Sequence, residues 1–164
     1  MAHPADEQPL PLAAGEHPPV PGAVKVSSVD MADAHHSTRT KARKAALDVL
    51  FESDLLGQDA SVSLAERLSD PEITVREFTR EIVLGVRDNA IEIDRRIATL
   101  TTSQWPIDRM PRIDRCLARM AIYELDYTGI DARAAISEAL ELADELSTDD
   151  SVAFLNGLLG RAAQ

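Results

Sequence analysis

Four basic side chains lie within six residues of the chain, and no acidic residue follows them until Asp48: Arg39, Lys41, Arg43 and Lys44. The apolar spacing that comes next predicts a helix starting at this run. A helix N-terminus carries partial positive charge, so each cation there costs about 0.3–1 kcal/mol at low salt. We therefore expect an anion outside the fold to compensate, and phosphate is the simplest one.

The spacing of these cations indicates how a phosphate chain would be held. Arg39 and Arg43 are one helical turn apart and share a face, while Lys41 and Lys44 occupy an adjoining one. Backbone N–H groups of the first turn and the Thr40 hydroxyl would add phosphate contacts. Four charges neutralise only a few phosphates, which favours a short single-stranded or looped RNA. An ordinary solvated basic run explains the charges alone equally well.

The overall charge makes this run a local exception. The chain has 164 residues and a formal net charge of −11, which argues against indiscriminate coating of nucleic acid. Any RNA binding is therefore expected at a confined cationic patch.

Residues that could catalyse a reaction are poorly placed. The four histidines, His3, His17, His35 and His36, all precede the expected helices, so a rigid histidine-dependent triad is not expected. Cys116 falls on an inward-facing apolar stripe and is interpreted as a buried hydrophobe. A single cysteine also argues against a multi-thiolate zinc site. We expect no enzyme, no metal and no cofactor.

The first 36 residues differ in composition from the rest. Six of the nine prolines fall in residues 1–36, which are predicted to be a disordered proline-rich tail. Residues 37–164 are expected to form one helical domain. The chain has no apolar run of roughly 18 residues and no signal-peptide pattern, which predicts a cytoplasmic protein without a membrane span.

Apolar periodicity predicts an all-α bundle of six or seven helices with short connections. The expected segments are Thr38–Leu56 with Gly57 as its stop, a short helix carrying Val62 and Leu68 before Pro71, a long helix over 78–100, a central helix from Pro111 to Gly129 with Tyr127 on its inward face, a helix carrying Ile136 and Leu146, and a last helix after Ser147.

Two local patterns refine these boundaries. Thr74 and Glu77 have the spacing of a capping box, and Ile73 and Phe78 flank them as a hydrophobic staple would. Trp105 and the proline after it predict a corner between helices.

Four motifs occur in order along the second half. Residues 105–111 read WPIDRMP, residues 113–125 read IDRCLARMAIYEL, residues 135–143 read AISEALELA, and residues 148–159 read TDDSVAFLNGLL. They resemble the corner, the central helix, the A-I-N-E-A helix and the terminal F-[VL]-N-G-[VL]-L element of the NusB transcription antitermination family. The similarity extends over about residues 38–163.

The resemblance implies an all-helical fold of two packed three-helix sub-bundles and a role without catalysis. It implies binding to the boxA RNA of ribosomal RNA transcripts, jointly with the small-subunit ribosomal protein NusE. Together they would act in the RNA polymerase antitermination complex. The family's arginine-rich first helix contacts RNA, which assigns that role to Arg39, Thr40, Lys41, Arg43 and Lys44.

The resemblance also implies further contact residues. Asp150 matches a position near the RNA surface, and Phe154 and Asn156 follow one turn on. Phe154 suits the core equally well, and Asn156 could bond the preceding turn. Asp114 matches an acidic position close to the ribosomal partner. Ser137 stands where the family has asparagine, which puts any contact made by that amide in doubt.

Three alternatives stay open from the sequence. A helical protein–protein adaptor would have the same pattern and bind no RNA. NusB-like domains also precede ribosomal RNA cytosine methyltransferase domains, and the chain could be a fragment of such an enzyme. The wide apolar helices could also support a homodimer.

Overall fold

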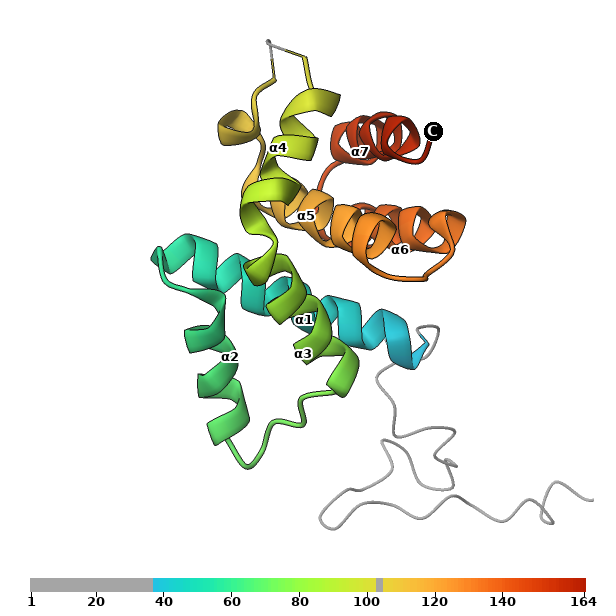
Figure 1. The fold of residues 1–164 in the computed structure, drawn as a ribbon. Helices are drawn as coiled ribbons and strands as arrows, with labels where there is room; N and C mark the ends of the chain where they lie inside the picture. Colours follow the sequence, from blue (N-terminus) through green and yellow to red (C-terminus); the bar gives the residue numbers. More distant parts are fainter. Residues whose placement is uncertain (1–36, 103–104) are drawn as a thin grey trace, which may run out of the picture. The chain divides into compact units, whose positions relative to one another are not determined.

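The computed structural model describes residues 37–102 and 105–164, and every regular element in these ranges is a helix (Figure 1). The prediction of an all-α fold is confirmed, whereas the prediction for residues 1–36 lies outside the described residues. The elements are α1 (Thr38–Leu56), α2 (Ala60–Ser69), α3 (Glu77–Asp88), α4 (Ala90–Leu100), the 3-10 turn η1 (Ile107–Arg109), α5 (Arg112–Tyr127), α6 (Ala132–Leu146) and α7 (Asp149–Ala162). None of the described helices is long and apolar enough to span a membrane.

Helix α1 begins and ends where the sequence predicts. The Ser37 hydroxyl accepts a hydrogen bond from the Thr40 backbone N–H and caps the first turn. At the other end Gly57 adopts φ +64°, a left-handed conformation that glycine takes without steric cost, and its N–H donates to the Ser53 carbonyl.

The predicted capping box at the start of α3 is wrong. The helix begins at Glu77 after an extended Arg76, so Thr74 lies outside it and is exposed. Ile73 is exposed as well and forms no staple. The residues before it form a separate turn, in which the Asp70 carboxylate accepts from the backbone N–H of residue 72.

The predicted long helix over residues 78–100 is two helices. The Asn89 side chain donates from Nδ2 to the Gly85 carbonyl at 2.8 Å, and the chain bends there between α3 and α4. The apolar stripe runs across the bend, because Ile82, Val86 and Ile93 are all buried. Hydrophobic periodicity alone therefore does not detect the break.

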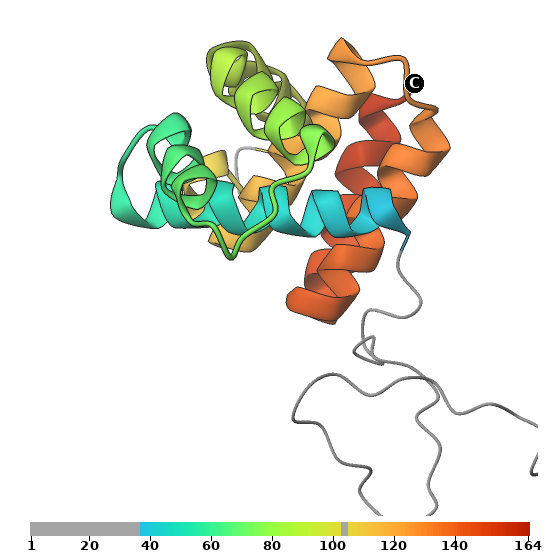
Figure 2. The same cartoon turned by 90° about the horizontal axis from the view of Figure 1, so that it is seen from below.

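The bend at Asn89 divides the helices between two groups. Helices α1, α2 and α3 pack on one another, and α4 joins α6 and α7 around α5 (Figures 1 and 2). Helix α5 also contacts α1 and α3, so it joins the two groups.

The predicted central helix is confirmed in α5. Seven of its apolar side chains are buried: Cys116, Leu117, Ala118, Met120, Ala121, Ile122 and Tyr123. Its close packing against α3 depends on Gly85, since a Cβ atom there would meet the Tyr123 ring at 2.1 Å. Tyr127 was expected to face inward, but it is exposed at the helix end and stacks on Tyr123 with ring centroids 5.9 Å apart.

Helix α2 presents a different face from the one its apolar spacing indicates. Val62 and Leu68 are exposed, whereas Ala60, Ser63 and Leu64 are buried. Apolar residues occur on both sides of this helix, so periodicity cannot choose between the two faces.

Candidate nucleic-acid interface

The first turns of α1 pack against α5 and α6. Arg43 is only 4% exposed, and its Nε and NH2 atoms donate to the two carboxylate oxygens of Glu124 at 2.7 and 2.9 Å. The Glu138 carboxylate lies 3.6 Å from NH1 of the same guanidinium. Burial lowers the pKa of Arg43, but the hydrogen bond and charge of Glu124 outweigh it and raise that pKa above its usual value.

Two other expected phosphate ligands also have partners inside the domain. The buried Thr40 hydroxyl donates to the Glu138 carboxylate, with oxygen–oxygen distances of 2.8 and 3.1 Å. Lys44 Nζ lies 2.6 Å from a carboxylate oxygen of Glu145 in a pair that is partly exposed.

These contacts provide compensation for the basic run from inside the domain. Much of the basic run is compensated within the fold by three glutamates, Glu124 on α5 and Glu138 and Glu145 on α6. The buried pair is the important one, because removing one partner of such a pair typically costs about 3–5 kcal/mol. An exposed pair such as that of Lys44 contributes about 1 kcal/mol at most.

Arg39 and Lys41 are placed differently from Arg43. Within residues 37–102 and 105–164, neither belongs to an ion pair. Arg39 is exposed, and its Cζ atom lies 4.6 Å from the centroid of the Phe78 ring on α3. Arg43 Cζ lies 5.1 Å from the same centroid, which confirms that the two arginines share a helix face.

Asp114, at the start of α5, connects this helix to the segment between α6 and α7 through hydrogen bonds. It is 2% exposed, and its two carboxylate oxygens accept from the Ser147 and Ser151 hydroxyls at 2.8 and 2.7 Å. These serines lie at the junction of α6 and α7, where the Thr148 hydroxyl caps α7 by accepting from the Ser151 backbone N–H. The structure thus places Asp114 at 2% exposure in the wall of the cavity that Trp105 and Asp150 also line.

Asp150 and Phe154 lie beside a cavity of about 320 Å³ close to this junction. Trp105 is 55% exposed there, and its ring centroid is 6.5 Å from that of the half-buried Phe154. Asp150 is exposed in the cavity wall, whereas Asn156 is exposed further along α7 and does not line it. The sequence reasoning assigned Trp105 to a corner only; its pairing with Phe154 needs the fold.

The predicted residues therefore form two groups. Glu124 follows Asp114 by ten residues on α5, which corresponds to about 15 Å along the helix axis. Arg43 binds near one end of α5, and the Trp105 cavity lies near the other. An RNA that contacts both groups has to extend along the domain.

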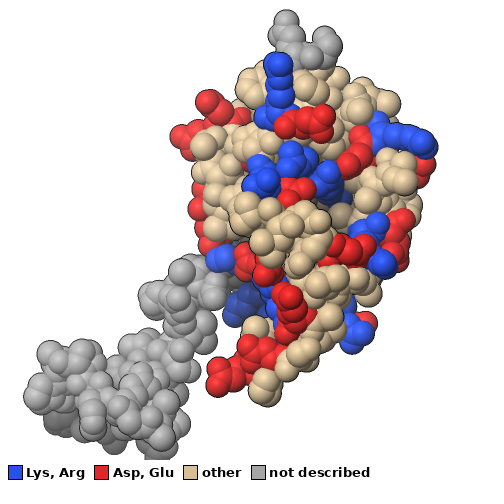
Figure 3. All heavy atoms as spheres, turned by 90° about the vertical axis from the view of Figure 1, so that its left-hand side faces the viewer, with Lys and Arg blue, Asp and Glu red and all other residues tan. Residues whose placement is uncertain are grey.

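A cluster around Asp54 was missed by the sequence reasoning. Its carboxylate lies 2.7 Å from Arg112 Nε, 2.6 Å from Arg115 NH2 and 3.5 Å from Arg119 NH1. Burial raises the pKa of Asp54, but hydrogen bonds from Arg115 and Arg112 outweigh it and lower that pKa. On the face that Figure 3 draws, basic and acidic side chains are intermixed. The available signal was the arginine spacing of three and four residues, which places all three on one helix face.

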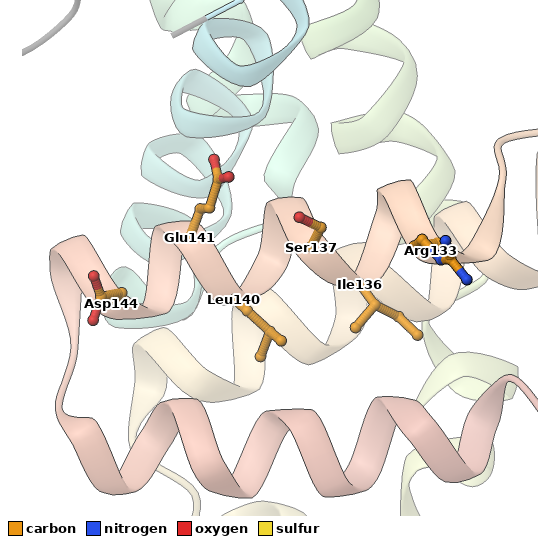
Figure 4. A pocket seen from close by; sticks show the side chains of 6 residues that line it. All are labelled: Arg133, Ile136, Ser137, Leu140, Glu141 and Asp144. Atoms are coloured by element: carbon orange, nitrogen blue, oxygen red, sulfur yellow. The ribbon is translucent and has the colours of Figure 1, made fainter. Parts of the chain in front are cut away.

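An open hollow of about 580 Å³ lies along α6 (Figure 4). Ile136 and Leu140 point toward α7, and Ser137 is exposed at the margin. The remaining lining residues are Arg133, Glu141 and Asp144.

Metal-binding groups are not assembled in the part of the chain that the structure describes. No group of three or more histidine, cysteine, aspartate or glutamate side chains there could hold a metal ion. Cys116 is buried as predicted, and burial raises the pKa of its thiol to about 11, so the thiol is protonated at neutral pH.

The fold and site thus define a class, that of all-helical domains whose first helix begins with a run of basic residues. Residues 40–164 match the profile of the NusB family. The chain belongs to the NusB family, as its motifs predict, and because that family is non-enzymatic the prediction that this chain is no enzyme is confirmed.

Relatives and solved structures agree with this assignment. The transcription antitermination protein NusB of Salinispora tropica is 50% identical over 130 residues, which cover 77% of this chain and 95% of that protein. NusB of Cutibacterium acnes is 46% identical over 136 residues, 83% of this chain; the chain spans only 52% of that longer protein. The structure resembles T. maritima NusB with a TM-score of 0.68 and 29% identity, covering 77% of this chain and 91% of that one. It also resembles a crystal structure of the antitermination factors NusB and NusE with double-stranded RNA, with a TM-score of 0.66 and 23% identity over 76% of this chain and 95% of that one.

Proposed function

We propose that this protein is a transcription antitermination factor that binds the boxA RNA of ribosomal RNA transcripts together with the ribosomal protein NusE. It would act in the cytoplasm as part of the RNA polymerase antitermination complex. The observation that carries this proposal is that Arg39 and Lys41, on the first turns of α1, form no ion pair with any residue that the structure describes, in a chain of net charge −11. The antitermination function of the relatives supports it.

The first contact region on RNA comprises Arg39, Lys41 and Lys44. Arg39 and Lys41 meet phosphates directly. Lys44 exchanges its exposed partner Glu145 for a phosphate at small cost, because such surface pairs are weak. Arg43 and Thr40 act indirectly, by holding α1 against α5 and α6.

The second contact region is the cavity beside Trp105. An unstacked base would lie against the aromatic rings of Trp105 and Phe154, as single-stranded RNA bases do on aromatic platforms. The Asp150 carboxylate repels phosphate, so its part is to accept a hydrogen bond from a base amino group. Asn156 would add a polar contact on α7. Asp114 supports this region by fixing the start of α7 through Ser151.

The ribosomal protein NusE is the proposed protein partner. One chain of the solved NusB–NusE–RNA assembly has the same fold as this chain, and the role of NusE is carried over from that assembly as part of the proposal. Alternatively, the exposed surface could bind a second copy of the chain in a homodimer. The alternative function is that of a helical protein–protein adaptor that binds no RNA.

Titration of labelled boxA RNA, with and without NusE, tests the proposal. A scrambled RNA of the same length is the control. We expect boxA to bind more tightly than the scrambled RNA and more tightly still when NusE is present. If boxA binds in neither condition while circular dichroism shows a folded helical protein, the adaptor function replaces the proposed one. Sedimentation at the same concentrations reports whether a homodimer forms.

A further inference from the structure

Two arginines share one aromatic ring in this domain, and only one of them is fixed by carboxylates. The Phe78 ring lies 4.6 Å from Arg39 Cζ and 5.1 Å from Arg43 Cζ. Arg43 is locked independently by its two hydrogen bonds to Glu124. Arg39 is exposed, and the structure gives its guanidinium the ring as a support.

The position of the ring is set by the residue that follows it. Thr79 is 1% exposed, and its hydroxyl donates to the Ala42 carbonyl of α1 at 3.0 Å. Ala42 lies between Arg39 and Arg43 in the sequence, so this bond fixes the start of α3 against the cationic turns of α1. Phe78 itself is half-buried and packs against the core.

We propose that Phe78 is a positioning residue that holds the Arg39 guanidinium ready for a phosphate of the bound RNA. This inference rests on the proposed function. A free arginine side chain loses much rotamer entropy when it is immobilised. Because the contact with the ring already restricts the Arg39 side chain before RNA binds, less entropy is lost on binding. The ring supports the guanidinium while its five N–H donors remain available for phosphate oxygens.

The effect of removing the ring follows from the strength of such contacts. Cation–π contacts at exposed sites correspond to about a two- to fivefold change in an equilibrium constant. Phe78→Leu keeps an apolar side chain of similar size and removes the ring. We expect RNA affinity to fall by about that factor, while Phe78→Tyr keeps the wild-type affinity because it retains a ring.

The salt dependence separates positioning from charge. Phe78→Leu removes no charge, so the slope of log affinity against log salt stays at its wild-type value. Arg39→Ala removes a phosphate contact, so the magnitude of that negative slope decreases by about 0.7–0.9. In the Arg39→Ala background Phe78→Leu should cause no further loss, because the side chain that the ring positions is gone.

Leu84→Ala is the matched control, since Leu84 is another partly buried apolar residue of α3. It should lower the melting temperature without weakening RNA binding. Wild-type RNA affinity in Phe78→Leu, or the same loss with and without Arg39, would overturn the inference. A loss in Leu84→Ala as large as that in Phe78→Leu would also overturn it.

A readout without RNA keeps this test separate from the proposed function. NMR relaxation of the Arg39 Nε–H group should show an ordered side chain in the wild type and a more mobile one in Phe78→Leu. Equal mobility in the two proteins would refute the ring contact whatever the RNA result. An ordered Arg39 in a wild type that binds no boxA RNA would instead refute the proposed function.

Discussion

Arg43 of α1 and Glu124 of α5 form a bidentate ion pair whose side chains are 5% and 3% exposed. This pair joins the N-terminal group of helices to the helix that organises the second group. A basic residue that the sequence assigns to RNA is thus part of the interior. The phosphate surface that we propose is therefore smaller and is centred on Arg39 and Lys41.

Loss of the Arg43 guanidinium should affect folding first. Arg43→Ala leaves the Glu124 carboxylate buried without its partner, and we expect the free energy of unfolding to fall by about 3–5 kcal/mol. Arg43→Lys should recover only part of this, because one ammonium cannot replace a bidentate fork. Urea unfolding followed by circular dichroism measures both. If Arg43→Ala left the stability unchanged but abolished RNA binding, the structural role of Arg43 would be contradicted, and direct contact between Arg43 and RNA would be the better explanation.

Acid should remove the stabilisation that Asp54 provides. The pKa of this carboxyl is lower in the folded protein than in the unfolded chain, so its contribution is present above the unfolded pKa. That contribution is lost as the pH falls through the lower folded pKa. The stability difference between wild type and Asp54→Asn should therefore be larger at pH 7 than at pH 3.

Urea midpoints over this pH range provide the measurement. Asp144→Asn is the control, since Asp144 is exposed on α6, and its difference from the wild type should stay small throughout. A pH-independent difference for Asp54→Asn would show that the arginine cluster does not depend on the Asp54 charge.

Two glycine-to-alanine substitutions in helices should have opposite effects. A Cβ atom at Gly85 would overlap the Tyr123 ring, so Gly85→Ala should destabilise the fold by about 1–3 kcal/mol. At Gly160 in α7 no atom lies within 4 Å of an added Cβ, and Gly160→Ala should stabilise by about 0.5–1 kcal/mol through helix propensity. Thermal unfolding of the two variants checks both signs. Stabilisation by both would mean that α3 and α5 do not approach as closely as described.

The features that the sequence predicted correctly depend on residues close together in the chain, such as helix caps and the apolar periodicity of a helix. The ends of α1 follow from Ser37 and Gly57, and the interior position of Cys116 follows from helical periodicity. The break at Asn89 was missed because one polar side chain bonding to Gly85 leaves the apolar pattern intact.

The candidate site was predicted less completely, for a physical reason. Whether Arg43 faces solvent or Glu124 depends on a contact between residues 81 positions apart, which local spacing does not report. The same applies to Asp54 and its arginines, and to Trp105 beside Phe154. Side-chain partners across helices become visible only when the helices are packed.

The most direct test of the central claim is the salt dependence of boxA RNA binding, measured with NusE present. The protein with Arg39→Ala and Lys41→Ala is compared with one carrying Arg87→Ala and Arg95→Ala, which removes two exposed cations from α3 and α4. We predict that the first variant binds more weakly at low salt, with a slope of log affinity against log salt reduced by about 1.4–1.8, while the second keeps the wild-type slope. Equal slopes in the wild type and both variants, with measurable RNA binding, would contradict the assignment of the RNA surface to the first turns of α1.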